Sequence, residues 1–261
     1  MEEKLIKQYG DELYEALITR NVIEPITDRS PEVTIEDAYR IQNQMIQRRL
    51  DAGESIIGKK IGVTSKAVMN MLNVYQPDFG YLLTDMVCSE GEDIPISEKM
   101  IQPKAEGEIA FLLKHDLQGP GLTNADILRA TEAVMPCFEI VDSRVRDWKI
   151  KIQDTVADNA SCGYLVLGGT AVNPRKVDLS VCGLTLEKNG ELMHTGAGAA
   201  ALGSPVNAMT WLANTMGELG VTLKAGEVIL SGALCAMVPA VAGDSMRVSI
   251  GGIGSTSVRF V

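Results

Sequence analysis

The chain has 261 residues, 46% of them hydrophobic, so it can bury the core of one large domain, or of one domain with a smaller appendage, and disorder does not dominate it. Its 24 Lys and Arg residues stand against 34 Asp and Glu residues, a formal net charge of −10, and no basic run is long enough to follow a phosphate backbone, which argues against nucleic acid as a partner. An acidic protein that binds an anionic small molecule needs local positive charge, either from a well-placed Lys or Arg or from a bound cation.

The cysteines and the opening residues indicate a cytoplasmic protein. The five cysteines are widely separated, odd in number and without a C-x-x-C pair, and the opening MEEKLIKQYGDE has no signal-peptide pattern. We therefore expect reduced thiols and a cytoplasmic location. The stretch from Leu192 to Gly217 carries no Asp, Glu, Lys or Arg, but it contains Pro205 and four glycines, which fit a lipid-facing helix poorly.

The first 53 residues or so have the pattern of helices. KLIKQYGDELYEALI places its apolar residues at helical spacing, and Thr34 with Asp37 has the form of a capping box that begins a further helix, which Gly53 would close. This region is predicted to be an N-terminal cap or small subdomain.

From Ile56 onward, short apolar runs separated by glycines predict strands of a mostly antiparallel sheet that is rolled or barrel-like. Asn189-Gly190 is a hairpin signal, because both turn positions need positive φ. Helices are expected between the strands at SKAVMNML, at TNADILRATEAV, and from Ser204 through Met216, where Ser caps the helix and Pro205 fits its first turn. The strand-like runs are SIIGKKIGVT, EGEIAFLLK, CFEIVDSR, GYLVLGG, GLTLEKNGELMHTG, GEVILSG and MRVSIGGIGSTSVRFV.

A pair of glutamates in KAEGEIAFLL is a candidate metal site. At strand periodicity Glu106 and Glu108 point to the same face with only Gly107 between them, and two adjacent carboxylates on an apolar strand repel unless protonated or neutralised by a cation. Glu139, in the apolar run MPCFEIVDSR, could complete a set of oxygen ligands, which favours Mg²⁺ or Mn²⁺ over zinc. The alternative is a solvated strand face, which is the commoner place for E-x-E. The two histidines, His115 and His194, have no metal-ligand spacing and are expected at the surface.

The two lysines in IIGKKIGVTS must face opposite ways if the run is a strand. Lys60 shares its face with Gly58 and Gly62, which clear room for a ligand or another backbone, whereas Lys59 shares its face with two isoleucines. Lys60 is therefore a candidate to bind a carboxylate or polarise a ketone. A bulge with two solvent-exposed lysines explains the pattern about as well.

Three further segments are less specific. Asp78, in VYQPDFGYL, lies in an extended or turn segment between a helix and a strand, where aspartates are commonly caps. VADNASCG places Ser161 just before an apolar strand and is equally readable as a helix end. The glycine spacing of TGAGAAALGS is wrong for a dinucleotide-binding loop, and the segment follows a hairpin, so a Rossmann fold is rejected.

Taken together, these segments resemble the 2-oxopent-4-enoate (2-hydroxypenta-2,4-dienoate) hydratases of the fumarylacetoacetate hydrolase superfamily. The resemblance covers essentially the whole chain and implies an α+β fold, with an N-terminal helical cap over residues 1–55 and a mixed β-roll catalytic domain over residues 56–261. The segments that carry it are GKKIGVTSKAVMNMLNVYQPDFGYL, IQPKAEGEIAF, PCFEIVDSR, DWKIKIQDTVADNASCG, GAGAAALGSPVNAMTWLAN and GGIGSTSVRF.

The resemblance also implies roles for individual residues. It places Mg²⁺ or Mn²⁺ on Glu106, Glu108 and Glu139, matches Lys60 to the family's active-site lysine and Asp78 to its active-site aspartate, and gives Ser161 a weaker claim to contact substrate. Related 4-oxalocrotonate decarboxylases share the glutamates and the lysine but carry an apolar residue where Asp78 stands. The superfamily's carbon–carbon hydrolases use a histidine in the cap, and no histidine precedes His115 here.

The expected activity is hydration of 2-hydroxypenta-2,4-dienoate to 4-hydroxy-2-oxopentanoate in the meta-cleavage pathway of aromatic catabolism. In the expected mechanism the metal polarises the substrate's 2-oxygen, Lys60 contacts the carboxylate or enolate, and Asp78 activates water or moves the tautomerising proton. A homo-oligomer, associated with 4-oxalocrotonate decarboxylase, is the expected assembly. Two alternatives remain: the chain is itself such a decarboxylase, or a non-catalytic partner subunit.

Overall fold

The computed structural model describes residues 1–261, except for the side chains of Met71 and Leu72. Its larger sheet has eight strands, and its smaller sheet has five. The larger sheet runs in the order β2 (Asp78–Leu83), β1 (Ile56–Gly62), β10 (Val228–Leu230), β5 (Pro103–Leu113), β6 (Thr131–Asp142), β7 (Cys162–Leu167) and β3 (Val87–Cys88), and β11 (Val238–Pro239) pairs with β5. The smaller sheet runs in the order β4 (Asp93–Ile94), β13 (Gly254–Phe260), β12 (Ser245–Ile250), β8 (Gly183–Lys188) and β9 (Glu191–Ala197).

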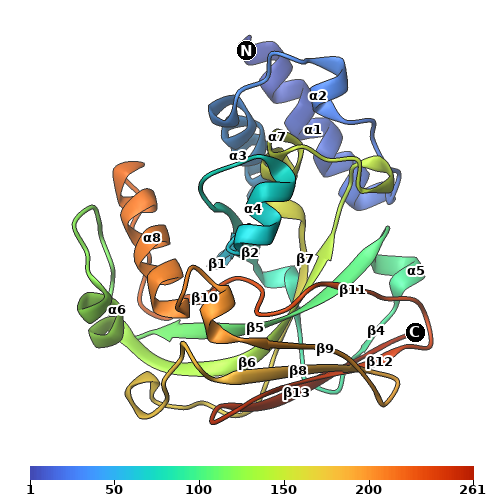
Figure 1. Ribbon diagram of the computed structural model, residues 1–261. Helices are drawn as coiled ribbons and strands as arrows, with labels where there is room; N and C mark the ends of the chain where they lie inside the picture. Colours follow the sequence, from blue (N-terminus) through green and yellow to red (C-terminus); the bar gives the residue numbers. More distant parts are fainter.

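The long strands β5 and β6 curve across the molecule above the five-stranded sheet (Figure 1). Most strand pairs are antiparallel, and the parallel ones are β1 with β10, β3 with β7, and β4 with β13. The predicted α+β class with a rolled, mostly antiparallel sheet is confirmed. The hairpin between β8 and β9 is confirmed as well, since Asn189 and Gly190 have φ values of 54° and 82°.

The main core lies between the two sheets. Ala105 and Ile109, on one face of β5, are buried in the same cluster as Leu184 of β8 and Val248 of β12. Gly107 belongs to this face too, because a Cβ atom there would lie 2.7 Å from the Val248 side chain. Since side chains alternate along a strand, the even-numbered residues of β5 point to the opposite face, away from the five-stranded sheet.

The N-terminal helices form a second, smaller core. The helices α1 (Glu3–Thr19), α2 (Ile26–Arg29) and α3 (Ile35–Asp51) gather at one end of the molecule with α7 (Ile152–Ala157) (Figure 1). Leu13, Ile41 and Met45 pack there with Val156 of α7, so a later segment of the chain contributes to this cluster. The predicted capping box is present: Asp37 N donates to Thr34 Oγ1 over 3.1 Å, and Thr34 N donates to Asp37 Oδ2 over 3.3 Å.

The remaining elements connect the strands. They include the helices α4 (Lys66–Leu72), α5 (Ile96–Lys99), α6 (Asn124–Ala130) and α8 (Pro205–Glu218) and the 3-10 turns η1 (Thr84–Met86), η2 (Arg146–Trp148), η3 (Asn159–Ser161), η4 (Pro174–Lys176) and η5 (Gly198–Ala200). Among the residues described, no helix has the length and apolar character needed to cross a membrane. All five cysteines are free thiols.

One predicted helix is too long. The segment TNADILRATEAV was expected to be helical throughout, but α6 ends at Ala130 and β6 begins at Thr131. Thr131 pairs with Leu113 of β5, and Ala133 pairs with Leu112. Pairing with a distant strand therefore overrides the local helical pattern over the last four residues.

Candidate active site

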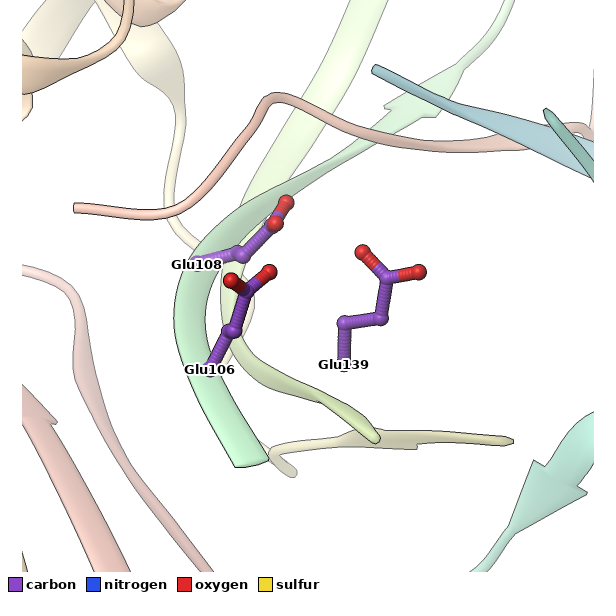
Figure 2. Close-up of side chains that lie close together, drawn as sticks. All are labelled: Glu106, Glu108 and Glu139. Atoms are coloured by element: carbon purple, nitrogen blue, oxygen red, sulfur yellow. The ribbon is translucent and has the colours of Figure 1, made fainter. Parts of the chain in front are cut away.

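Three glutamates converge on the face of β5 and β6 that points away from the five-stranded sheet. Glu106 and Glu108 are two residues apart on β5, and Glu139 of β6 is the cross-strand partner of Glu106. One carboxylate oxygen from each of the three lies within 4.8 Å of the others. Figure 2 shows the carboxylates of Glu106 and Glu108 side by side, with that of Glu139 facing them across a common space.

The three carboxylates are poorly compensated within the protein. Glu108 and Glu139 are 1% and 0% exposed, and Glu106 is half-buried. Gly232 N donates to Glu108 Oε2 over 2.8 Å, but Glu108 Oε1 and Glu139 Oε2 have no hydrogen-bond partner among the described residues, and the group that faces Glu139 Oε1 is the Lys60 ammonium, 3.1 Å away. Buried charged oxygens without donors are costly, and like charges on directly opposite strand positions repel. This arrangement fits a hard divalent cation, which prefers oxygen ligands.

The pKa values of the glutamates also fit a bound cation. Burial, reinforced by the charge of Glu139, raises the pKa of Glu106 to about 7. Burial and the charges of Glu139 and Glu106 also raise the pKa of Glu108 well above its usual value. A cation bound among these carboxylates would remove the repulsion and keep them ionised at neutral pH.

Lys60 reaches this cluster from β1. Its Nζ lies 3.1 Å from Glu139 Oε1, and its side chain is buried. Burial alone would lower the pKa of Lys60, but the charges of Glu139 and Asp78 outweigh burial and raise it. Lys60 therefore stays a cation beside the carboxylates of Glu139 and Asp78.

Asp78 is the first residue of β2 and pairs with Gly62 of β1, so it lies on the Lys60 face of the sheet. It is 2% exposed, and its Oδ1 has no hydrogen-bond partner in the part of the chain described. Burial raises its pKa to about 6, against the opposing effect of Lys60. A Cβ atom at position 62 would lie 2.2 Å from Asp78 Oδ1 and 3.4 Å from Lys60 Nζ, so glycine is needed for these groups to meet.

Both glycines beside Lys60 give room for a close approach, but to different groups. At Gly58 the group is another backbone, because a Cβ atom there would lie 1.8 Å from the carbonyl oxygen of Val228 on the neighbouring strand β10. The alternative of two solvent-exposed lysines is wrong. Lys59 is buried on the opposite face, where its Nζ lies 2.5 Å from Glu227 Oε1.

Ser161 is buried but is not brought into contact with the carboxylates by any hydrogen bond in the structure. Its hydroxyl lies 3.0 Å from Thr155 Oγ1. Its neighbours have structural partners too: Asp158 forms a buried ion pair with Arg144, and Asn159 bonds the backbone of Tyr81. The predicted substrate contact of Ser161 stays a prediction. His115 is exposed and His194 is half-buried, both outside this cluster.

Sequence reasoning missed Gly232 as a member of the site. Its contribution is a backbone N–H, a group that every residue except proline has, so the residue type does not identify it. Gly232 has φ of 100°, and a Cβ atom there would lie 2.4 Å from the Thr64 side chain, so only glycine brings this N–H to Glu108. The one available signal was the Ser231-Gly232 pair directly after the apolar run EVIL.

Comparison with known proteins places this chain in a family. Residues 59–261 match the family described as fumarylacetoacetate (FAA) hydrolase C-terminal. The chain belongs to this family. Among FAA hydrolase family members, a 2-hydroxypent-2,4-dienoate hydratase of Pseudomonas putida is 66% identical over 85% of this chain and 100% of its own length. A 2-hydroxyhexa-2,4-dienoate hydratase of Comamonas testosteroni is 53% identical over 99% of this chain and 98% of its own length.

A solved family member has nearly the same structure. The 4-oxalocrotonate decarboxylase from Pseudomonas putida G7, complexed with magnesium and adipate, superposes with a TM-score of 0.96 at 36% identity and covers 100% of this chain and 99% of its own. The same enzyme has also been solved with calcium and acetate. The expected relationship to both hydratases and decarboxylases is therefore confirmed, and the fold alone does not separate the two activities.

Proposed function

We propose that this protein is a divalent-metal-dependent hydratase that adds water to 2-hydroxypenta-2,4-dienoate (2-oxopent-4-enoate) and forms 4-hydroxy-2-oxopentanoate in the meta-cleavage pathway. The observation that carries the proposal is Asp78. Its carboxylate is buried beside Lys60, and its Oδ1 has no hydrogen bond among the described residues. This oxygen can therefore accept a proton from a bound water molecule, as a general base does. The hydratase names of relatives at 66% and 53% identity support the same reaction.

Glu106, Glu108 and Glu139 would hold the metal, Mg²⁺ or Mn²⁺, through their converging carboxylate oxygens, of which those of Glu139 and Oε1 of Glu108 are buried without a hydrogen bond among the described residues. When bound there, such an ion supplies Lewis acidity that stabilises negative charge on the 2-oxygen of the substrate. The fourth carboxylate, Asp78, lies beyond Lys60 and is left for proton transfer.

Lys60 would contact the carboxylate or the 2-oxygen of the substrate and share the charge that develops there. It is suited to this role because it keeps its proton among four carboxylates. The reaction needs two proton movements. The 2-hydroxyl of the dienol loses a proton and C5 gains one as the conjugated ketone forms, and water then loses a proton as its oxygen bonds to C4, while C3 gains one. Asp78, with a pKa of about 6, is mostly ionised at neutral pH and would take the proton from water during the attack on C4.

The second candidate is decarboxylation of 4-oxalocrotonate, the activity named for the solved structure that superposes with a TM-score of 0.96. That reaction breaks a carbon–carbon bond and releases carbon dioxide without adding water, so it does not use a base in the position of Asp78. Ultraviolet loss of hydroxypentadienoate, assayed with and without Mg²⁺ or Mn²⁺ and alongside carbon dioxide release from 4-oxalocrotonate, separates the two activities. Hydration with little carbon dioxide supports the proposal, and the reverse supports the second candidate.

The proposal includes a cytoplasmic homo-oligomer that associates with a 4-oxalocrotonate decarboxylase. The resemblance in sequence supports this assembly. Light scattering of the purified protein, alone and mixed with a decarboxylase subunit, tests it. A monomer that does not bind the decarboxylase would contradict this part of the proposal without affecting the catalytic part.

A further inference from the structure

The strand that carries Asp78 is the edge strand of the larger sheet. On its inner side β2 pairs with β1, and its outer side has no partner strand among the described residues. Asp78 is also the first residue of β2, so strand pairing holds it from one direction only. A free edge leaves backbone groups in need of partners, and burying them without partners is costly.

Two buried amide side chains take the place of the missing strand. Gln42 Nε2, from α3, donates to Phe79 O over 3.0 Å. Asn159 forms two bonds with Tyr81: Tyr81 N donates to Asn159 Oδ1 over 2.8 Å, and Asn159 Nδ2 donates to Tyr81 O over 2.9 Å. Both amide residues are 0% exposed. The outer edge of β2 is therefore bonded at the first and third residues after Asp78.

The backbone around Asn159 is strained. Asn159, Ala160 and Ser161 have φ values of 54°, 50° and 54°, three consecutive non-glycine residues in the left-handed region. Such strain collects at functional sites, where the surrounding structure holds it in place. A Cβ atom at Gly80 would lie 2.5 Å from Asn159 O, so glycine allows this turn to press directly against β2.

The side chain that α3 contributes, Gln42, is not the one that would stabilise the fold best. Gln42 Nε2 donates to Val156 O over 3.0 Å as well as to Phe79, but Gln42 Oε1 is buried without a partner. Leaving a buried acceptor unpaired costs free energy that an apolar side chain would avoid. Tyr39, one turn before Gln42, stacks on the Phe79 ring with 4.4 Å between centroids and 17° between planes. Two residues of α3 thus hold the residue next to Asp78.

We propose that Gln42 and Asn159 form an amide clamp on β2 that positions Asp78 relative to Lys60, and that the N-terminal helices act on the reaction through it. The clamp rests on the proposed role of Asp78. It assigns to α3 a part in turnover although no residue of α3 belongs to the carboxylate cluster. Gln42 and Asn159 are positioning residues, because they act on Asp78 through the backbone of Phe79 and Tyr81.

The test compares two substitutions on the same helix. Gln42→Met keeps the length of the side chain and removes the donor to Phe79, whereas Gln47→Met changes an exposed glutamine of α3 and is the matched control. In the Mg²⁺-loaded enzyme we expect Gln42→Met to lower kcat about 10- to 100-fold, as small displacements of a catalytic group do. KM and the dissociation constant for Mn²⁺ should stay within about twofold, because the clamp contacts neither the glutamates nor Lys60. Wild-type kcat in folded Gln42→Met would overturn the clamp.

Combining substitutions separates positioning from general stability. In an Asp78→Asn background, Gln42→Met should have little further effect on the residual rate, because the group that it positions is already disabled. An equal loss in both backgrounds would overturn the clamp. If Gln42→Met does not fold, Asn159→Asp replaces the donor to Tyr81 O by an acceptor and should give the same pattern. If Asp78→Asn keeps full turnover, the proposed function fails and the clamp with it, whereas a neutral Gln42→Met beside an inactive Asp78→Asn contradicts the clamp alone.

Discussion

Lys60 Nζ lies 3.1 Å from Glu139 Oε1 although β10 and β5 separate their strands, β1 and β6, in the sheet. In a flat sheet these side chains would be well separated, since neighbouring strands lie about 4.8 Å apart. The curvature of the sheet therefore gathers Lys60 and three glutamates on one face. Lys104, two residues before Glu106 on β5, adds a second positive charge nearby, with its Nζ 4.1 Å from the centroid of the Trp148 ring. These two lysines do not balance Glu106, Glu108, Glu139 and Asp78, and this excess of negative charge fits a further cation.

The first prediction concerns the metal. Glu108→Gln should weaken Mg²⁺ and Mn²⁺ binding by roughly 100-fold or more and abolish turnover at ordinary metal concentrations, because it removes one of three charged ligands. The variant should stay folded, and without metal it should melt at a higher temperature than the wild type, since one buried like charge is gone. Chelator treatment of the wild type should abolish turnover, and Mg²⁺ or Mn²⁺ should restore it. Full activity in a verified metal-free preparation would contradict the metal site.

The second prediction separates the two adjacent lysines. Lys60→Ala should lower kcat far more than Lys59→Ala, measured in both cases with saturating Mg²⁺. Lys59→Ala should instead lower the free energy of unfolding by about 3 kcal/mol, because it leaves Glu227 without its buried partner, while the folded fraction keeps its kcat. Similar, small effects of both substitutions on kcat would show that the Lys60 face has been misassigned.

The third prediction concerns stability and pH in the metal-free protein. Burial raises the pKa of Asp78 from 3.8 to about 6 and that of Glu106 from 4.5 to about 7. A carboxyl group with a raised folded-state pKa binds its proton more tightly in the folded state, so its stabilising effect is present at low pH and is lost as pH rises through that pKa. The free energy of unfolding should therefore increase by about 1 kcal/mol or more between pH 8 and pH 5.5.

Saturating Mg²⁺ should remove or reverse this pH trend, because a bound ion favours the ionised carboxylates. Urea unfolding at several pH values, with Mg²⁺ and with chelator, gives the comparison. A metal-free protein that becomes less stable from pH 8 to pH 5.5 would argue against ionised, uncompensated carboxylates in the site.

Much of the local structure was readable from the sequence because it depends on neighbours along the chain. The capping box of Thr34, the Asn189-Gly190 turn, and the shared face of Glu106 and Glu108 all follow from spacings of one to three residues. The contrast between the two lysine faces follows from strand alternation in the same way. These features are set by backbone geometry, which short sequence patterns encode directly.

The remaining features depend on pairing between distant segments. Glu139 lies opposite Glu106 only because of the register between β5 and β6, and Lys59 is neutralised by a residue 168 positions away. The end of α6 at Ala130 is likewise set by the strand pairing that begins at Thr131. The glutamate cluster could be proposed from the residues themselves. The clamp on β2 could not, because short sequence patterns do not give the pairing between distant segments.

The fourth prediction concerns the base. Because Asp78 must be ionised to accept a proton and burial raises its pKa to about 6, kcat/KM should fall as pH drops below about 6. Asp78→Asn should lower kcat by about a hundredfold to ten-thousandfold and leave KM and Mn²⁺ affinity nearly unchanged. The residual kcat/KM of Asp78→Asn should no longer fall as pH drops below about 6. A variant that keeps the wild-type rate and this fall in kcat/KM would exclude Asp78 as the base.

The most direct test of the central claim is product analysis with the wild-type enzyme and Mg²⁺. The hydratase assignment predicts that 2-hydroxypenta-2,4-dienoate is converted to 4-hydroxy-2-oxopentanoate, with loss of dienoate absorbance that depends on the metal, and that 4-oxalocrotonate releases little carbon dioxide. Rapid carbon dioxide release from 4-oxalocrotonate together with poor hydration of the dienoate would contradict the assignment and identify the protein as a decarboxylase.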